Sequence, residues 1–224
     1  MIPPTQATSI RDFFVNEVNN TITIVYQDKY LLVANKPSKL LSVPGRGAHK
    51  QDSLIYRLQK TQPETRIVHR LDYDTSGLMV LARNAEIHRQ LSLAFEQRRV
   101  NKRYLARVQG KLPCLQGAID LPLALDWHNR PKHQVDMNYG KPAQTAWQVV
   151  STNDSTSLVQ LFPHTGRSHQ LRVHMLSMGC PIVGDPLYHP TPDDYPRLCL
   201  HAQYLSFEHP VYKKQQSFEC DSNF

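Results

Sequence analysis

Short runs of β-branched and aromatic residues follow one another along most of this 224-residue chain, with few helical segments between them. Strands are predicted at 22–26, 30–34, 66–69, 77–82, 104–108, 118–121, 145–150, 157–162 and 198–207. Helical spacing predicts helices only at 53–60, 84–99 and 168–178. Parallel neighbours need long crossover connections, so strands that follow one another directly must pair antiparallel. The pattern therefore predicts an α+β fold, with a mixed, mostly antiparallel central sheet and flanking helices.

The domain organisation is predicted to be simple. Residues 1–20 mix Pro, Thr, Asn and Gln without periodicity and are interpreted as an N-terminal tail. Residues 21–224 contain no repeat or low-complexity linker and are interpreted as one domain. The proline-rich segment 180–197 is interpreted as a long surface loop within it.

Charge and cysteine usage indicate the partner and the compartment. Lys+Arg number 26 against 19 Asp+Glu, a net charge of +7, which favours a polyanionic partner, with nucleic acid ahead of an acidic membrane. No apolar stretch approaches the roughly 20 residues that cross a bilayer, and the first residues do not resemble a secretory signal. Four cysteines without a C-x-x-C pair indicate free thiols. We therefore expect a cytoplasmic protein with no membrane association.

The most informative motif is HRLDYDTSG at 69–77, which lies between two predicted strands. Asp72 follows Arg70 by two residues, and a positive charge within about 4–6 Å would lower the pKa of its carboxyl group by roughly 1–3 units. An ionised aspartate can act as a nucleophile or as a base. The alternative interpretation is an exposed polar turn with a surface ion pair.

A second motif, TGRSHQLRVH at 165–174, lies at the start of the third predicted helix. Arg167 near the first turn, together with backbone amides, would suit a phosphate group, and Arg172 follows along the helix. His169 and His174 are five residues apart, about 140° around a helix, and the arginines would repel a dication, so no metal site is predicted. A solvated basic helix face is the alternative.

Two further segments, RRVNKRY at 98–104 and WHNRPKH at 127–133, place cations beside aromatic side chains. This combination suits single-stranded or looped RNA, because charge binds the backbone and flat rings stack on unpaired bases. Both could equally be solvated loops, and Tyr104 a core residue. Sequence motifs for phosphate loops, dinucleotide binding, serine hydrolases and zinc proteases do not occur.

Taken together, these motifs resemble the RluA family of RNA pseudouridine synthases. The match runs from NKPSKLLSVPG at 35–45, through HRLDYDTSGLMVLA, NKRYLARV, GKPAQT and TGRSHQLRVHM, to RLCLHA at 197–202. The resemblance implies the pseudouridine synthase core with a catalytic cleft. It also implies conversion of uridine to pseudouridine in large-subunit (23S) ribosomal RNA and in the anticodon stem-loop of tRNA, with no metal or small-molecule cofactor.

The resemblance also implies roles for individual residues. Asp72 would be the catalytic aspartate, and Arg172 would pair with it. Tyr104 would stack on the target base and help to move a proton. Arg70 would take the place of the base that is flipped out of its stack. The remaining predicted substrate-binding residues are His69, Arg167, Arg130 and Lys132.

Two features differ from the family pattern. Lys39 stands where we expect glycine, which leaves the conformation of its loop open. Many relatives carry an N-terminal S4-type RNA-binding domain, whereas only the tail precedes the first predicted strand here. We therefore expect the catalytic core, as a monomer, to recognise RNA without that domain.

Two other functions fit part of the sequence. An RNA-binding protein without catalysis would explain the basic surface, but it leaves Asp72 without a purpose, since a carboxylate weakens phosphate binding. A nucleoside or glycosyl hydrolase could use Asp72 and Asp74 as a carboxylate pair. The separation of two carboxylates on a turn does not follow from sequence, so the hydrolase remains an alternative.

Overall fold

The computed structural model describes residues 22–222 and 224, so the predicted tail at 1–20 lies outside the described residues. The main sheet has ten strands. Its order is β1 (Thr23–Gln27), β2 (Leu31–Lys36), β4 (Ser76–Ala82), β11 (Leu200–Glu208), β5 (Asn101–Gln109), β10 (Thr156–Pro163), β9 (Gln144–Thr152) and β6 (Gln116–Asp120). In addition, β12 (Gln215–Glu219) pairs with β11, and β3 (Arg66–Ile67) with β4. Among these described pairs only β4 and β11 run parallel, which confirms the mixed, mostly antiparallel sheet.

Three α-helices flank this sheet in the described part of the chain: α1 (Leu54–Gln59), α2 (Ala85–Glu96) and α3 (Gln170–Ser177). Short 3-10 helices lie at η1 (Ala48–Lys50) and η2 (Pro192–Asp194). A separate two-stranded sheet is formed by β7 (Leu123–Leu125) and β8 (His133–Val135). None of the helices in the described residues is long and apolar enough to cross a membrane.

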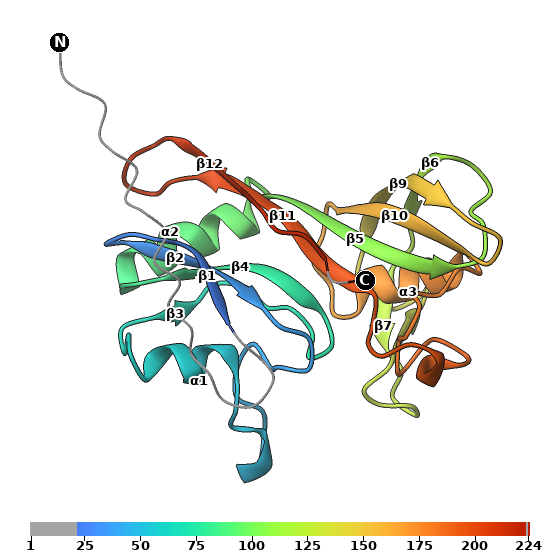
Figure 1. Ribbon diagram of the computed structural model, residues 1–224, viewed down its shortest axis with the longest axis horizontal. Coiled ribbons are helices and arrows are strands. Elements are labelled where there is room, and N and C mark those ends of the chain that lie inside the picture. The colour runs from blue at the N-terminus through green and yellow to red at the C-terminus, as the bar shows by residue number, and fades with distance from the viewer. Residues whose placement is uncertain (1–21, 223) are drawn as a thin grey trace.

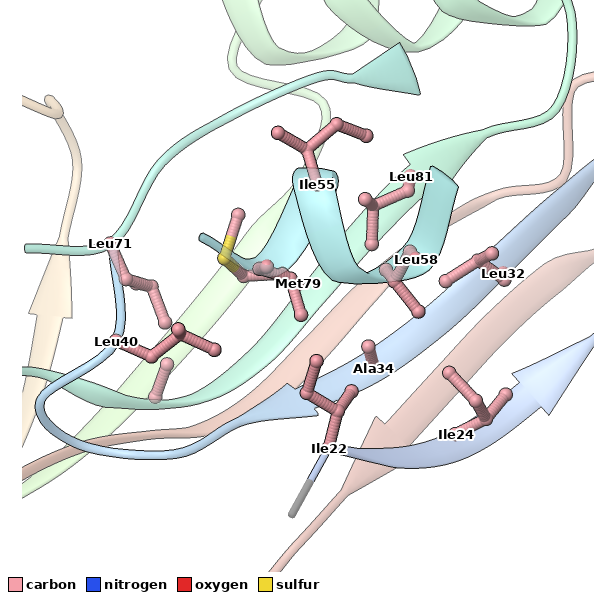
Figure 2. Packing of buried hydrophobic residues seen from close by; sticks show 12 residues of the cluster. Ile22, Ile24, Leu32, Ala34, Leu40, Ile55, Leu58, Leu71, Met79 and Leu81 are labelled. Carbon is pink, nitrogen blue, oxygen red and sulfur yellow. The ribbon is translucent and has the colours of Figure 1, made fainter. Parts of the chain in front are cut away.

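Strand β4 is buried along its whole length because a helix covers each face of the sheet there. Met79 and Leu81 pack with α1, whereas Leu78 and Val80, which point to the other face, pack with α2. Figure 2 shows the first of these layers, in which α1 lies over strands β1, β2 and β4. In Figure 1 this layered half lies beside a second half built from β5, β10, β9, β6 and α3. Strand β11 joins the two halves, since it pairs with β4 on one side and β5 on the other.

Local sequence determines where two of the helices begin. The side chain of Asn84 accepts a hydrogen bond from the backbone N–H of Ile87 and so caps the start of α2. Ser53 caps the start of α1, because its hydroxyl accepts a hydrogen bond from the backbone N–H of Tyr56. The preceding residue, Asp52, forms an ion pair with Arg57 on the helix.

Two parts of the fold differ from the sequence-based prediction. The strands β7, β8 and β12 were not predicted, because they are short or polar. The prediction of a surface loop at 180–197 was wrong for its first part, since residues 181–185 are buried. There Ile182 forms a β-bridge with Val108, and the backbone N–H of Val183 donates to the carbonyl of Arg107. The prolines stop a regular strand, but the apolar residues between them still enter the core.

We expect Gly77→Ala to lower the free energy of unfolding by about 2–3 kcal/mol. Gly77 has a φ of 120°, and an added Cβ would lie 2.4 Å from the carbonyl oxygen and 2.5 Å from the nitrogen of Ala202 in β11. Gly110→Ala is the matched control, because its φ of 78° is also left-handed but an added Cβ meets nothing within 4 Å. That variant should lose only about 1 kcal/mol. Equal losses in urea denaturation would contradict the close approach of β4 to β11.

Candidate active site

A cleft of about 1150 Å³ lies over one half of the sheet, bordered by β5, β6, β9, β10, the end of α2 and the turn at 69–72. It brings together residues from distant parts of the sequence. Of the predicted site residues, the cleft is lined by His69, Arg70, Asp72, Tyr104 and Arg167. A smaller hollow of about 100 Å³ shares four of these residues and also reaches Arg172. The predicted cleft is therefore present, and most of the predicted site faces it.

The turn that carries Asp72 is anchored by the residue before it. Leu71 packs into the hydrophobic core under α1. The hydroxyl of Ser42 both donates to the carbonyl oxygen of Leu71, at 2.7 Å, and accepts from its backbone N–H, at 3.1 Å. Because the chain is held on this inner side, the next side chain turns outward, and the carboxylate of Asp72 is 28% exposed at the cleft.

The positive charge beside Asp72 comes from Arg172 on α3, with Nη1 at 3.3 Å from Oδ2. This is the pair that the family resemblance implied, and it corrects the expectation, made from spacing alone, that Arg70 supplies that charge. Within the described residues Arg70 forms no ion pair, and it lies exposed in the cleft. The guanidinium of Arg172 is only 2% exposed, and its Nε and Nη2 each donate to a carboxylate oxygen of Asp185 at 2.7 Å. One arginine therefore joins a fully buried carboxylate to the carboxylate in the cleft.

Tyr104 lies on β5, where both halves of the core meet. Its side chain is half-buried and borders the cleft. Burial, and then the nearby carboxylate of Asp72, raises the pKa of the Tyr104 hydroxyl well above its usual value. The phenol is therefore protonated at neutral pH, as a group that stacks on a base and donates a hydrogen bond would need to be.

His69 has structural partners as well as a place in the cleft. Its ring stacks on Phe95, with centroids 4.4 Å apart, and its Nε2 accepts a hydrogen bond from the backbone N–H of Val80 at 3.1 Å. Burial lowers the pKa of His69 to about 3, so the ring is neutral. This histidine therefore lines the cleft without adding a positive charge.

The other predicted substrate-binding residues fall into two places. Arg167 lines the cleft, but its backbone N–H donates to the side chain of Gln170. This amide is therefore not free for a phosphate, contrary to the sequence-based expectation. Arg130 and Lys132 lie in the connection between β7 and β8 and are not among the residues that line the cleft. The guanidinium of Arg130 lies 3.7 Å from the ring centroid of Trp127, whose side chain is 69% exposed. These two cations therefore belong to a separate connection and not to the lining of the cleft.

The structure adds two residues that the sequence motifs did not assign. Asp185 lies in the proline-rich segment, whose composition predicts a surface loop, although the apolar residues before it indicate burial. Lys36 is fully buried, and its Nζ donates to the carbonyls of Pro37, Leu40 and Tyr73 at 2.9, 2.7 and 3.3 Å. Burial lowers the pKa of Lys36 to about 7. This lysine ties the 35–45 loop to the turn that carries the cleft carboxylate.

The backbone at Lys39 shows why the family pattern has glycine at this position. Its φ is 60°, in the left-handed region that glycine adopts most readily. The backbone conformation expected for that glycine is thus kept, and the lysine Nζ reaches the carbonyl of Pro196 at 3.5 Å.

Comparisons with known proteins agree with this site. Residues 30–177 match the family model described as RNA pseudouridylate synthase. The dual-specificity RNA pseudouridine synthase RluA of Yersinia pestis is 50% identical over 204 residues, covering 90% of this chain and 99% of the relative. The protein of that name from Escherichia coli K12 is 47% identical over 207 residues, covering 91% and 94%.

A solved structure supports the same assignment. The human RNA pseudouridylate synthase domain containing 1 superposes with a TM-score of 0.78 at 30% identity, over 91% of this chain and 84% of the human chain. The family model, the identity to the bacterial relatives and the shared fold lead to one conclusion. The chain belongs to the RluA family of RNA pseudouridine synthases, isomerases that convert uridine in RNA to pseudouridine.

Proposed function

We propose that this chain modifies uridines in both large-subunit (23S) ribosomal RNA and the anticodon stem-loop of tRNA, with Asp72 as its catalytic carboxylate. The observation that carries the proposal is one arginine-paired carboxylate at the wall of a large cleft. The relatives that are about half identical to this chain are named dual-specificity enzymes. We further expect a cytoplasmic monomer that needs neither metal nor small-molecule cofactor, because isomerisation involves no redox change and no energy input.

The chemistry requires a carboxylate, an aromatic platform and a flipped base. Uracil is detached from C1′, turned and rejoined through C5, and the C5 hydrogen leaves as a proton. Asp72, which accepts a hydrogen bond from Arg172, can as a carboxylate either attack C1′ or remove the C2′ proton. Tyr104 supplies a ring and a protonated hydroxyl beside it. Arg70, exposed and without an ion-pair partner in the described residues, suits the space that the flipped base leaves.

Tritium release from C5-labelled transcripts tests the proposed substrates. Ribosomal RNA and tRNA transcripts should both lose tritium to water, and mapping should place pseudouridine at discrete positions in each. Release from only one transcript would remove the dual specificity. Free uracil would instead indicate a hydrolase, and binding without release would indicate an RNA-binding protein.

We expect RNA affinity to fall steeply with salt, by about 0.7 log units per log unit of salt for each single-strand phosphate contact. The cations expected to contribute are Arg98, Arg99, Lys102, Arg103, Arg130 and Lys132. Arg103 should contribute least, because it already pairs with Glu219. Arg130→Ala and Lys132→Ala should each reduce the measured slope by about 0.7. A slope unchanged in both variants would show that the β7–β8 connection does not contact phosphates.

A further inference from the structure

His169 lies beside the cleft carboxylate, directly before the first residue of α3. Its Nε2 is 4.0 Å from Oδ2 of Asp72, and its Nδ1 is 2.8 Å from the hydroxyl oxygen of Tyr188. The φ of 55° is left-handed, which residues other than glycine seldom adopt. The surrounding contacts therefore hold both the backbone and the ring of His169 in one orientation.

The hydroxyl of Tyr188 determines which imidazole nitrogen carries the hydrogen. The backbone N–H of His133 donates to this hydroxyl oxygen at 2.7 Å, so the hydroxyl must donate its own hydrogen elsewhere. Within the described residues its one acceptor is Nδ1 of His169. If Nδ1 carried the hydrogen instead, a hydroxyl on a side chain only 8% exposed would donate to nothing. The neutral ring therefore carries its hydrogen on Nε2, the nitrogen that faces Asp72.

The surroundings of the ring also keep it uncharged. The titratable and charged groups that face it from the neighbouring elements are Asp72, Asp185, Arg172, His133 and Tyr188. Burial is the main cause that lowers the pKa of His169 to about 4, and it outweighs the two carboxylates, which act in the opposite direction. At neutral pH His169 can donate a hydrogen bond but brings no second positive charge to the site.

We propose that His169 is a positioning residue for Asp72, which it orients through a hydrogen bond from Nε2 to Oδ2. This inference rests on the proposed catalytic role of Asp72. Arg172 also donates to Oδ2, and within the described residues no hydrogen bond reaches Oδ1, so Oδ1 is left for the ribose. The present separation of 4.0 Å is longer than a hydrogen bond, so the proposed role requires that the contact shorten when RNA fills the cleft.

The tautomer can be tested without any enzymatic activity. In protein labelled with ¹⁵N-histidine, with His169→Gln to assign the signal, Nδ1 should resonate as an unprotonated nitrogen and Nε2 as a protonated one at pH 7. A hydrogen on Nδ1, or a charged ring at pH 7, would overturn the inference. Because this measurement does not depend on catalysis, it separates a failure of the inference from a failure of the proposed function.

Kinetics test the positioning role. His169→Leu should lower kcat by about 10- to 100-fold with KM within about 3-fold, because a donor to the reacting carboxylate is lost. It should also move the acidic limb of the pH profile up by about 0.5–1 pH unit, since the ionised carboxylate loses a hydrogen bond. His169→Gln keeps an N–H donor and should restore most of kcat and the original limb. Equal losses in both variants, or a change in KM alone, would contradict the role.

Tyr188→Phe provides a second variant if His169→Leu does not fold. It removes the hydroxyl that fixes the tautomer and leaves the imidazole in place. The acidic limb should move up as it does for His169→Leu, and the ¹⁵N spectrum should show that the preference for Nε2–H is lost. An unchanged limb and an unchanged spectrum would overturn the inference.

Discussion

Replacing Asp72 with asparagine is expected to lower pseudouridine formation by at least about 10³-fold while RNA affinity stays within a few-fold. The amide has nearly the same shape, but it can neither attack C1′ nor remove the C2′ proton. Affinity is retained because the substitution removes a charge that repels phosphates, and because the cations that bind phosphates are unchanged. Tritium release measures the first quantity and equilibrium binding to the same transcript measures the second. Full activity of Asp72→Asn would exclude this residue as the catalytic group.

Asp74→Asn is the matched control for that experiment. Asp74 is two residues away on the same turn and is also partly buried, but it does not line the cleft. Burial raises the pKa of the Asp74 carboxyl group, which means that its ionised form is destabilised. The neutral amide of asparagine should therefore be tolerated at this position. We expect activity within about five-fold of the unmodified protein. Comparable losses at both positions, with free uracil as the product, would instead support the carboxylate-pair hydrolase.

Strand and helix positions could be predicted where one residue pattern dominates. The run SGLMVLA indicates a strand buried on both faces, and β4 is such a strand. The same reasoning fails where proline interrupts an apolar run, because local breakers hide the long-range contact that buries the segment. Ile182 pairs with a residue more than 70 positions earlier in the chain, Val108, and no local pattern contains that information. The polar strand β12 is likewise defined by its partner β11 and not by its own alternation.

The site could be predicted only as far as its motifs extend. HRLDYDTSG identified Asp72. Spacing alone pointed to Arg70 as its partner, whereas the family resemblance implied Arg172, which the fold brings to Asp72 across 100 residues of sequence. An ion pair between neighbours in sequence needs no fold, so it was the simplest expectation from residues alone. The orientation of His169 depends on a hydroxyl from another segment, and no motif records that contact.

We expect Arg172→Met to cost about 3–5 kcal/mol of unfolding free energy and to abolish activity, because it leaves a buried charge without its partner. Asp185 is fully buried and accepts two hydrogen bonds from this arginine. The same substitution removes the charge at Oδ2 of Asp72, so stability and catalysis are lost together. Arg172→Lys keeps the charge but not the planar fork, and should show an intermediate loss in both urea denaturation and tritium release.

A double-mutant cycle separates the cost of the unpaired charge from the cost of lost packing. Asp185→Asn removes the negative charge but keeps an oxygen that can accept from the backbone N–H groups of Leu187 and Tyr188. If burial of a lone carboxylate causes the loss, Arg172→Met with Asp185→Asn should be more stable, by about 1–3 kcal/mol, than the sum of the two single variants predicts. Activity should stay absent in the double variant, because Asp72 still lacks its arginine. Strict additivity would mean that the pair contributes through packing, and recovery of activity would remove Arg172 from the catalytic site.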